Sequence, residues 1–298
     1  MASRATALLV ALAALGCAER LVPVPGTLAV EVGFDSREAV LALLSPVPHD
    51  DVDRKDRLLE LFRLAGCTGV EERRPGAELP NLICTLPGAS GVTIVVAAHF
   101  DRRSYGTSAV DNWSGAALLP TLYRALSVAP RRHTFAFIGF SEVERVRTPK
   151  YEELPPASQH FLHSLTPGER RRLVAMVNLK GLGLGTTSVW TARADPNLHL
   201  DLYSVSRSLN MPLRQIDFRG YVQADIHSFR RSHIPSILIH SFDPKSGLLL
   251  EQPQRDRPEA IQGAAYFETY RLVAVYLAYL DRTLERRRAL AGGAGASG

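Results

Sequence analysis

Hydrophobic patterns typical of strands and of helices alternate along most of this 298-residue chain, and this alternation limits its possible folds more than any other feature. Residues 92–98 form an apolar run that is interrupted only by Thr93, as expected for a strand that is buried on both faces. Strands are expected at residues 81–86, 92–98, 134–140, 173–179, 188–192 and 235–241. Helices are expected at residues 37–44, 51–65, 114–126, 195–209 and 258–288. The sequence therefore predicts an α/β fold, a three-layer α/β/α sandwich with a mixed, mostly parallel central sheet.

We expect the chain to contain one folded domain. It has no internal repeat and no linker rich enough in Gly, Pro or Ser to separate two domains. The domain is placed at residues 18–290, after a leader at 1–17 and before a flexible tail at 291–298 that is rich in Gly and Ala. The charged, proline-bearing segment 143–156 is interpreted as an insertion loop.

The first 17 residues have the pattern of an export signal. Arg4 precedes an apolar run, residues 5–16, that is too short to cross a bilayer. Cys17 follows Ala14-Leu15-Gly16, which is similar to the bacterial lipoprotein signal, in which the cysteine is acylated. The alternative is ordinary cleavage near Ala18. Both interpretations predict a protein of the bacterial cell envelope or a secreted protein, and acylation would attach it to the membrane.

Charge and cysteine content narrow the possible partners and compartments. The formal net charge is +5, but only four of the 35 basic residues are Lys and the Arg residues are scattered among acids. No nucleic-acid partner is therefore expected. If Cys17 is lipidated, Cys67 and Cys84 remain as a pair that could form one disulfide in an oxidising compartment. Two separate buried thiols are the alternative.

Polar residues follow the expected strands at the edge where open α/β sheets form their clefts. One strand leads into His99-Phe100-Asp101, in which the carboxylate could orient the imidazole. The next strand leads into Ser141-Glu142-Val143-Glu144, and Asp111 precedes the helix between them. Each has an ordinary explanation by itself, such as a helix cap for Asp111. The combination of these residues, in this order along the chain, is specific enough to indicate a functional site.

In these stretches the sequence resembles the secreted dizinc exopeptidases of metallopeptidase family twenty-eight, which includes bacterial aminopeptidases and the related glutaminyl cyclases. The resemblance extends over residues 36–285. It is carried by the stretches 81–88 (NLICTLPG), 95–101 (VVAAHFD), 110–115 (VDNWSG), 134–144, 177–179 (VNL) and 225–238. It implies a mixed sheet between helix layers and two zinc ions that are bridged by one aspartate. By resemblance Asp111 is the bridging residue, His99 is a ligand of one zinc, and Asp101 buttresses that histidine.

The family also has two adjacent glutamates after the third strand, the first a general base and the second a zinc ligand. Counting from Phe140 places Val143 at the base and Glu144 at the ligand. Shifting by one residue instead makes Glu142 the base and Val143 the lost ligand. In both registers a valine, which neither takes a proton nor binds a metal, replaces one of the two carboxylates.

Two further positions depart from the family pattern. Lys180 stands where the family has an aspartate that completes a zinc site. The family's last ligand is a histidine four residues before an aspartate, and counting back from Asp256 gives Gln252. His240 is nearby in the sequence but lies on the strand itself, so we do not expect it to replace this ligand.

These losses favour a protein without catalysis. A hydrolytic zinc site needs at least three protein ligands and a base for the metal-bound water, and the Lys180 ammonium would repel zinc while pairing with Asp111 and Glu144. The favoured interpretation is a non-catalytic family member that binds a peptide or another envelope protein through the cleft that holds the active site in the family. The alternative is a working hydrolase, aminopeptidase-like or cyclase-like, with a single-metal site built from His99, Asp111 and Glu144.

Overall fold

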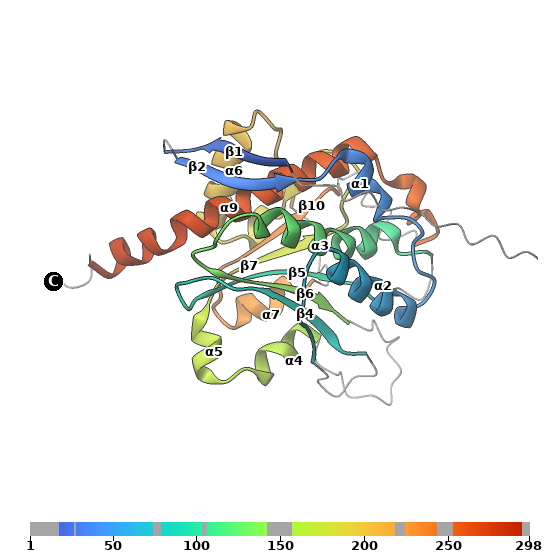
Figure 1. Ribbon diagram of the computed structural model, residues 1–298, viewed down its shortest axis with the longest axis horizontal. Helices are drawn as coiled ribbons and strands as arrows, with labels where there is room; N and C mark the ends of the chain where they lie inside the picture. Colours follow the sequence, from blue (N-terminus) through green and yellow to red (C-terminus); the bar gives the residue numbers. More distant parts are fainter. Residues whose placement is uncertain are drawn as a thin grey trace, which may run out of the picture.

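The computed structural model confirms the predicted three-layer architecture (Figure 1). The described residues are 18–26, 28–73, 79–102, 106–141, 157–217, 224–242 and 253–293. Four residues singled out in the sequence lie outside them: Glu142, Val143, Glu144 and Gln252. The expected leader at 1–17 and insertion loop at 143–156 also lie outside the described residues.

An eight-stranded mixed sheet forms the centre of the described structure. The strand order is β3-β4-β6-β5-β7-β10-β8-β9, and β6, β5, β7 and β10 run parallel to one another. Antiparallel pairing joins β3 to β4, β4 to β6 and β10 to β8. In chain order the strands are β3 Val70–Arg73, β4 Asn81–Leu86, β5 Thr93–His99, β6 Thr134–Phe140, β7 Leu173–Lys180, β8 Ser188–Val189, β9 Arg214–Gln215 and β10 Ser236–His240.

Helices cover both faces of this sheet (Figure 1). On one face α3 contacts β5, β6 and β7 and packs against α2 and α9, and on the other α7 contacts β7 and β10 and packs against α4. The first layer comprises α1 Arg37–Ala42, α2 Asp51–Leu64, α3 Ser114–Ser127, α6 Pro196–Ser208 and α9 Gly263–Gly293. The second comprises α4 Ala157–Ser164, α5 Pro167–Arg172 and α7 Ile226–Arg231. None of the described helices is long and apolar enough to cross a membrane.

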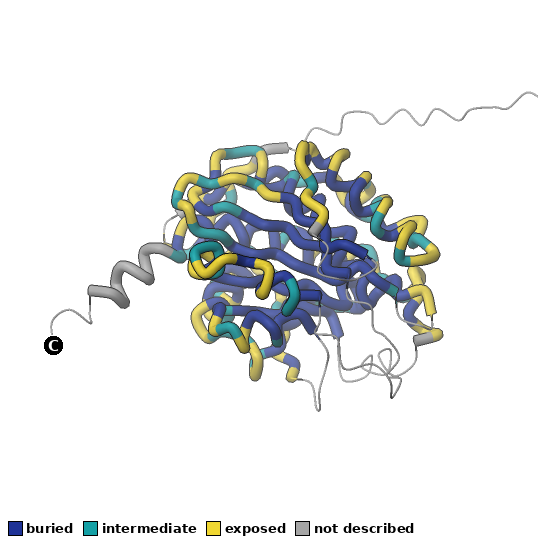
Figure 2. The backbone as a smooth tube through the Cα atoms, turned by 90° about the horizontal axis from the view of Figure 1, so that it is seen from below, coloured by how far each residue is buried: buried dark blue, intermediate teal, exposed yellow. Residues whose placement is uncertain are grey.

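The central strands are buried on both faces, as their continuous apolar sequences predict (Figure 2). Side chains alternate between the two faces of a strand. In β5, Ile94 and Val96 therefore join the larger hydrophobic core under α2, α3 and α9. Val95 and Ala97 join the smaller core that contains Phe161 of α4.

Two predicted elements have different bounds in the structure. The strand expected at 188–192 is only β8, because the chain turns into the 3-10 helix η2, Thr191–Arg193. The helix expected at 258–288 is divided into η4, Pro258–Ala260, and α9. Gln262, between them, donates from its backbone N–H to Gly183 and from its side chain to Leu184. These bonds hold the chain against another loop, so the long helix begins one residue later and continues to Gly293, past residue 290.

Residues 18–34, whose sequence predicts no helix or strand, form an antiparallel hairpin in the structure. The strands are β1, Ala18–Val24, and β2, Leu28–Phe34, and β2 contacts α3 and α9. Prolines weaken a strand pattern because they cannot donate to the ladder, and Pro23 lies within β1. A two-stranded hairpin tolerates such a residue because each strand has one free edge.

A disulfide joins Cys67, which follows α2, to Cys84 in β4, so the first of the two cysteine interpretations is confirmed. The Cα atoms are 6.3 Å apart and both side chains are buried. Closing a loop of this length typically stabilises a fold by about 3 kcal/mol. The bond fastens the end of α2 to the sheet.

Candidate functional site

The pairing of β5 with β7 brings two of the singled-out residues together. The strands are parallel, with Ala97 opposite Asn178, so His99 and Lys180, two residues further along, end their strands side by side. Both therefore lie at the carboxyl edge of the sheet, where the sequence predicts the cleft.

Asp111 is brought to the same place by a short kinked turn, η1 Ala109–Trp113, in which Asp111 and Asn112 have non-helical backbone angles and which leads into α3. The Asp256 carboxylate accepts hydrogen bonds from the backbone N–H groups of Val110, at 2.6 Å, and Asp111, at 3.1 Å. The Asn112 amide donates to the carbonyl oxygen of Leu179, at 2.9 Å. These bonds fix the turn against the end of β7.

Four side chains form a buried polar cluster at this edge: His99, Asp101, Asp111 and Lys180. Lys180 Nζ lies 2.7 Å from Asp111 Oδ1 and 3.0 Å from His99 Nε2. His99 Nδ1 lies 3.1 Å from Asp101 Oδ1, and its Nε2 lies 3.3 Å from Asp111 Oδ1. Their exposed fractions are between 2% and 7%. A lysine ammonium thus lies between the two described positions at which the family resemblance implies zinc ligands.

The charges in this cluster balance. Burial and the Lys180 ammonium lower the pKa of His99, but Asp101 and Asp111 outweigh them and raise this pKa to about 9. A protonated His99 donates from Nδ1 to Asp101 and from Nε2 to Asp111. The 3.0 Å between His99 Nε2 and Lys180 Nζ is then the separation of two donors that share Asp111 Oδ1. Two cations and two carboxylates leave the four residues without net charge.

Asp225, at the start of α7, forms a second layer beneath the cluster. The Asn178 amide donates to Ala97 O at 3.1 Å and to Asp225 Oδ2 at 3.3 Å. Burial raises the pKa of Asp225, while the charges of His99 and Lys180 oppose this shift. Among the described residues, Asp225 Oδ1 is buried without a hydrogen-bond donor. Asp225 was included in the stretch 225–238, but the sequence analysis gave it no role.

Arg54 holds the backbone just after β5 and just before η1. This fully buried guanidinium donates to the carbonyl oxygens of Phe100, Thr107 and Ser108 and lies 5.6 Å from the centre of the Trp113 ring. Burial lowers the pKa of Arg54 to about 10, so it stays charged at neutral pH. No sequence motif had indicated a role for this residue.

A zinc ion does not fit this arrangement of the described residues. Two ligands of one tetrahedral zinc ion, each about 2.0–2.1 Å from it, lie roughly 3.3 Å apart. His99 Nε2 and Asp111 Oδ1 have that separation, 3.3 Å, but Lys180 Nζ lies within 3.0 Å of both. A second cation in this space would be repelled. In the described part of the chain, moreover, no three His, Cys, Asp or Glu residues are placed to hold a metal ion.

His240, the last residue of β10, has its own contacts beside the end of β7. Its Nδ1 accepts a hydrogen bond from the Phe242 N–H at 3.1 Å, and the two rings stack. Burial lowers the pKa of His240 to about 3, so the imidazole is neutral. The structure thus brings His99, Asp101, Asp111 and Lys180 together. The predicted roles of Glu142, Val143, Glu144 and Gln252 remain predictions, because these positions lie outside the described residues.

Comparisons with known proteins agree with this fold. The model of peptidase family M28 matches residues 81–274. A zinc aminopeptidase from Bacillus subtilis is 19% identical, with a TM-score of 0.56, and the match covers 67% of this chain and 49% of that one. The LapA aminopeptidase of Legionella pneumophila is 18% identical, with a TM-score of 0.68 and coverages of 83% and 71%. A glutaminyl cyclase from Fimbriiglobus ruber is 17% identical, with a TM-score of 0.61 and coverages of 82% and 92%.

The chain spans about half the length of the Bacillus subtilis enzyme. No curated protein matches the sequence significantly. At these identities the likeness to solved structures shows a shared fold.

Replacing Lys180 by Met is expected to destabilise the protein by about 3 kcal/mol at pH 7, because His99 alone then faces two carboxylates and the buried cluster keeps one uncompensated negative charge. This excess charge raises the pKa values of the carboxylates in the folded variant. The deficit is therefore complete above those values and shrinks as pH falls through them, because protonation removes the excess charge of the variant. Urea unfolding at several pH values measures it.

Lys55→Met is the matched control, because Lys55 pairs with Asp56 on the outside of α2, where Asp56 is 63% exposed. A surface pair of this kind contributes at most about 1 kcal/mol. A Lys180→Met variant as stable as the wild type at pH 7 would contradict the arrangement described above.

Proposed function

Since the chain belongs to peptidase family M28, we propose that it is a member in which the Lys180 ammonium has replaced the catalytic metal, so that peptide hydrolysis is lost and ligand binding remains. The observation that carries this proposal is the position of Lys180 Nζ, 2.7 Å from Asp111 Oδ1 and 3.0 Å from His99 Nε2. A tethered charge there neutralises Asp111 without the open coordination position that hydrolysis requires.

Loss of hydrolysis follows from the chemistry of the cluster. The family reaction needs a metal-bound water and a base that takes its proton. The lysine ammonium neither coordinates water as a Lewis acid nor leaves His99 Nε2 free for a metal. A valine at one of the two glutamate positions after β6 removes either the base or a ligand as well.

The ligand of such a protein is a peptide or another protein of the cell envelope. Its fold is shared with proteins described as aminopeptidases and glutaminyl cyclases, which supports a peptide-like ligand at the carboxyl edge of the sheet. The competing function is an active hydrolase with one metal on His99, Asp111 and Glu144. That function requires the Lys180 side chain to leave its present position beside His99 and Asp111.

Metal content distinguishes the two functions. Protein purified without chelator and dialysed against micromolar zinc is expected to retain well under one equivalent of zinc. Chelator is expected to change its melting temperature by less than about 1 °C, because a metal stabilises a fold only to the extent that it binds the native state. Atomic absorption and thermal unfolding measure the two quantities.

A leucine p-nitroanilide assay on the same preparation should give no turnover above that of the buffer, with or without zinc. Tightly held zinc together with turnover that chelator abolishes would overturn the proposal in favour of the hydrolase.

The proposed location is the bacterial cell envelope or the outside of the cell. The Cys67–Cys84 disulfide supports it, because disulfides persist in oxidising compartments and are rare in the cytosol. The export pattern of residues 1–17, with Cys17 at its end, supports attachment through a lipid anchor.

A Cys17→Ser variant tests the anchor. The wild-type protein is expected to partition into the detergent phase of a Triton X-114 extraction, whereas the variant either stays uncleaved or becomes soluble. Mass spectrometry of the mature amino terminus accompanies the extraction. A soluble wild-type protein whose mature chain begins after residue 17 would exclude lipidation of Cys17.

A further inference from the structure

A second polar site lies at the opposite edge of the sheet from the Lys180 cluster. It is a cavity of 480 Å³ between α5 and the turn that leads from α7 into β10. Leu173, the first residue of β7, contributes to its wall, and Lys180 is the last residue of that strand. Seven steps of about 3.3 Å separate the two ends, so the sites are roughly 23 Å apart.

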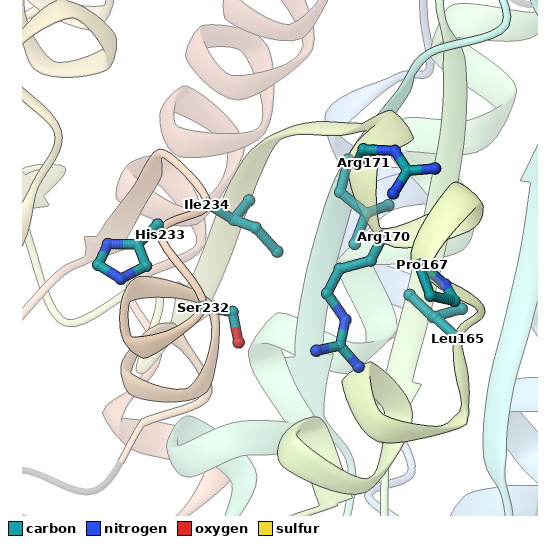
Figure 3. A pocket seen from close by; sticks show the side chains of 8 residues that line it. Leu165, Pro167, Arg170, Arg171, Ser232, His233 and Ile234 are labelled. Carbon is teal, nitrogen blue, oxygen red and sulfur yellow. The ribbon is translucent and has the colours of Figure 1, made fainter.

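The cavity has a basic lining without acids. Its walls are formed by Leu165, Pro167, Arg170, Arg171, Leu173, Ser232, His233 and Ile234. Figure 3 shows the Arg170 guanidinium on the side of the cavity where Ser232 lies, while Arg171 extends in another direction and the His233 ring points away. Within the described residues, neither arginine forms an ion pair with a carboxylate.

One hydrogen bond holds the Arg170 guanidinium, and its other N–H groups have no acceptor in the described part of the chain. Its Nη2 donates to the carbonyl oxygen of Leu162 at 2.5 Å, which fixes one end of the guanidinium. Its Nε is buried and has no hydrogen-bond acceptor in the described part of the chain. Its Nη1 also lacks an acceptor among the described residues and, unlike Nε, is not buried, so an acceptor in the cavity can reach it.

Apolar groups line the same cavity. Leu165, Leu173 and Ile234 are each at most 9% exposed, and Pro167 lies beside Leu165 in the wall. A volume of 480 Å³ is within the range of about 300–1,000 Å³ for small-molecule sites and exceeds what a bare phosphate would fill. Arginine is also the side chain best suited to bind carboxylate or phosphate through two parallel hydrogen bonds.

We propose that this cavity binds a small organic anion, with its phosphate or carboxylate group on Arg170 and Ser232 and its apolar part against Leu165, Pro167 and Ile234. Such a ligand accepts hydrogen bonds from the Nη1 donors of Arg170 and covers the apolar wall. This binding is separate from any ligand at the Lys180 cluster.

Thermal unfolding of the full chain tests the site with phenyl phosphate, inorganic phosphate and sodium chloride at equal ionic strength. Phenyl phosphate at ten times its Kd is expected to raise the melting temperature by about 3 °C. Inorganic phosphate is expected to give a smaller rise, because it lacks the apolar part, and chloride none. Equal shifts with all three salts would overturn the proposal, and equal shifts with the two phosphates would exclude a role for the apolar wall.

Arg170→Gln is expected to abolish the shift, whereas Arg172→Gln should keep it, because Arg172 is exposed on the same helix and does not line the cavity. If Arg170→Gln does not fold, Ser232→Ala provides the second variant, with an expected loss of affinity of at least roughly tenfold for one hydrogen bond to a charged group. Shifts in both cavity variants that equal the wild-type shift would show that the anion binds elsewhere.

Discussion

The ion pair between Lys180 and Asp111 is the interaction on which the candidate site depends. Taking two charges out of water costs several kcal/mol for each ion unless they are closely paired, and these two side chains are each 3% exposed. Their 2.7 Å contact, together with the neighbouring pair of His99 and Asp101, keeps the buried cluster electrically balanced. The Lys180 ammonium thus supplies the positive charge that a bound metal would otherwise have to supply to this cluster of carboxylates and imidazole.

The surrounding fold keeps that pair in place. The register of β5 with β7 sets His99 beside Lys180, and Asp256 holds the backbone of the turn that carries Asp111. Arg54 fixes the segment that precedes the turn. Side chains from α2, the sheet and the region before α9 therefore converge on one buried contact, which makes a small displacement of Lys180 costly.

The parallel centre of the sheet and most of the cluster could be predicted from the sequence. Strands such as β5 and β7 are buried on both faces, so their apolar runs are long and distinct, and the residues that end them are easily located. Arg54 escaped prediction because a charged residue on a helix is usually exposed. Its place four residues before Leu58, on the apolar stripe of α2, was the signal that could have identified it. Asp256 had no comparable signal, because it lies in a loop far along the chain from the turn it binds, and the short edge strands β3 and β9 have too few buried residues to form a pattern.

The most direct test of the central claim is the thermal unfolding of Lys180→Asp with and without zinc, beside the wild type and Lys55→Asp. The substitution removes the competing cation and adds a third possible ligand to His99 and Asp111, the smallest protein ligand set of a zinc site. Zinc is expected to raise the melting temperature of Lys180→Asp by several degrees and to leave the wild type and Lys55→Asp unchanged. A zinc-dependent rise in the wild type, or none in Lys180→Asp, would contradict the replacement of the metal by Lys180.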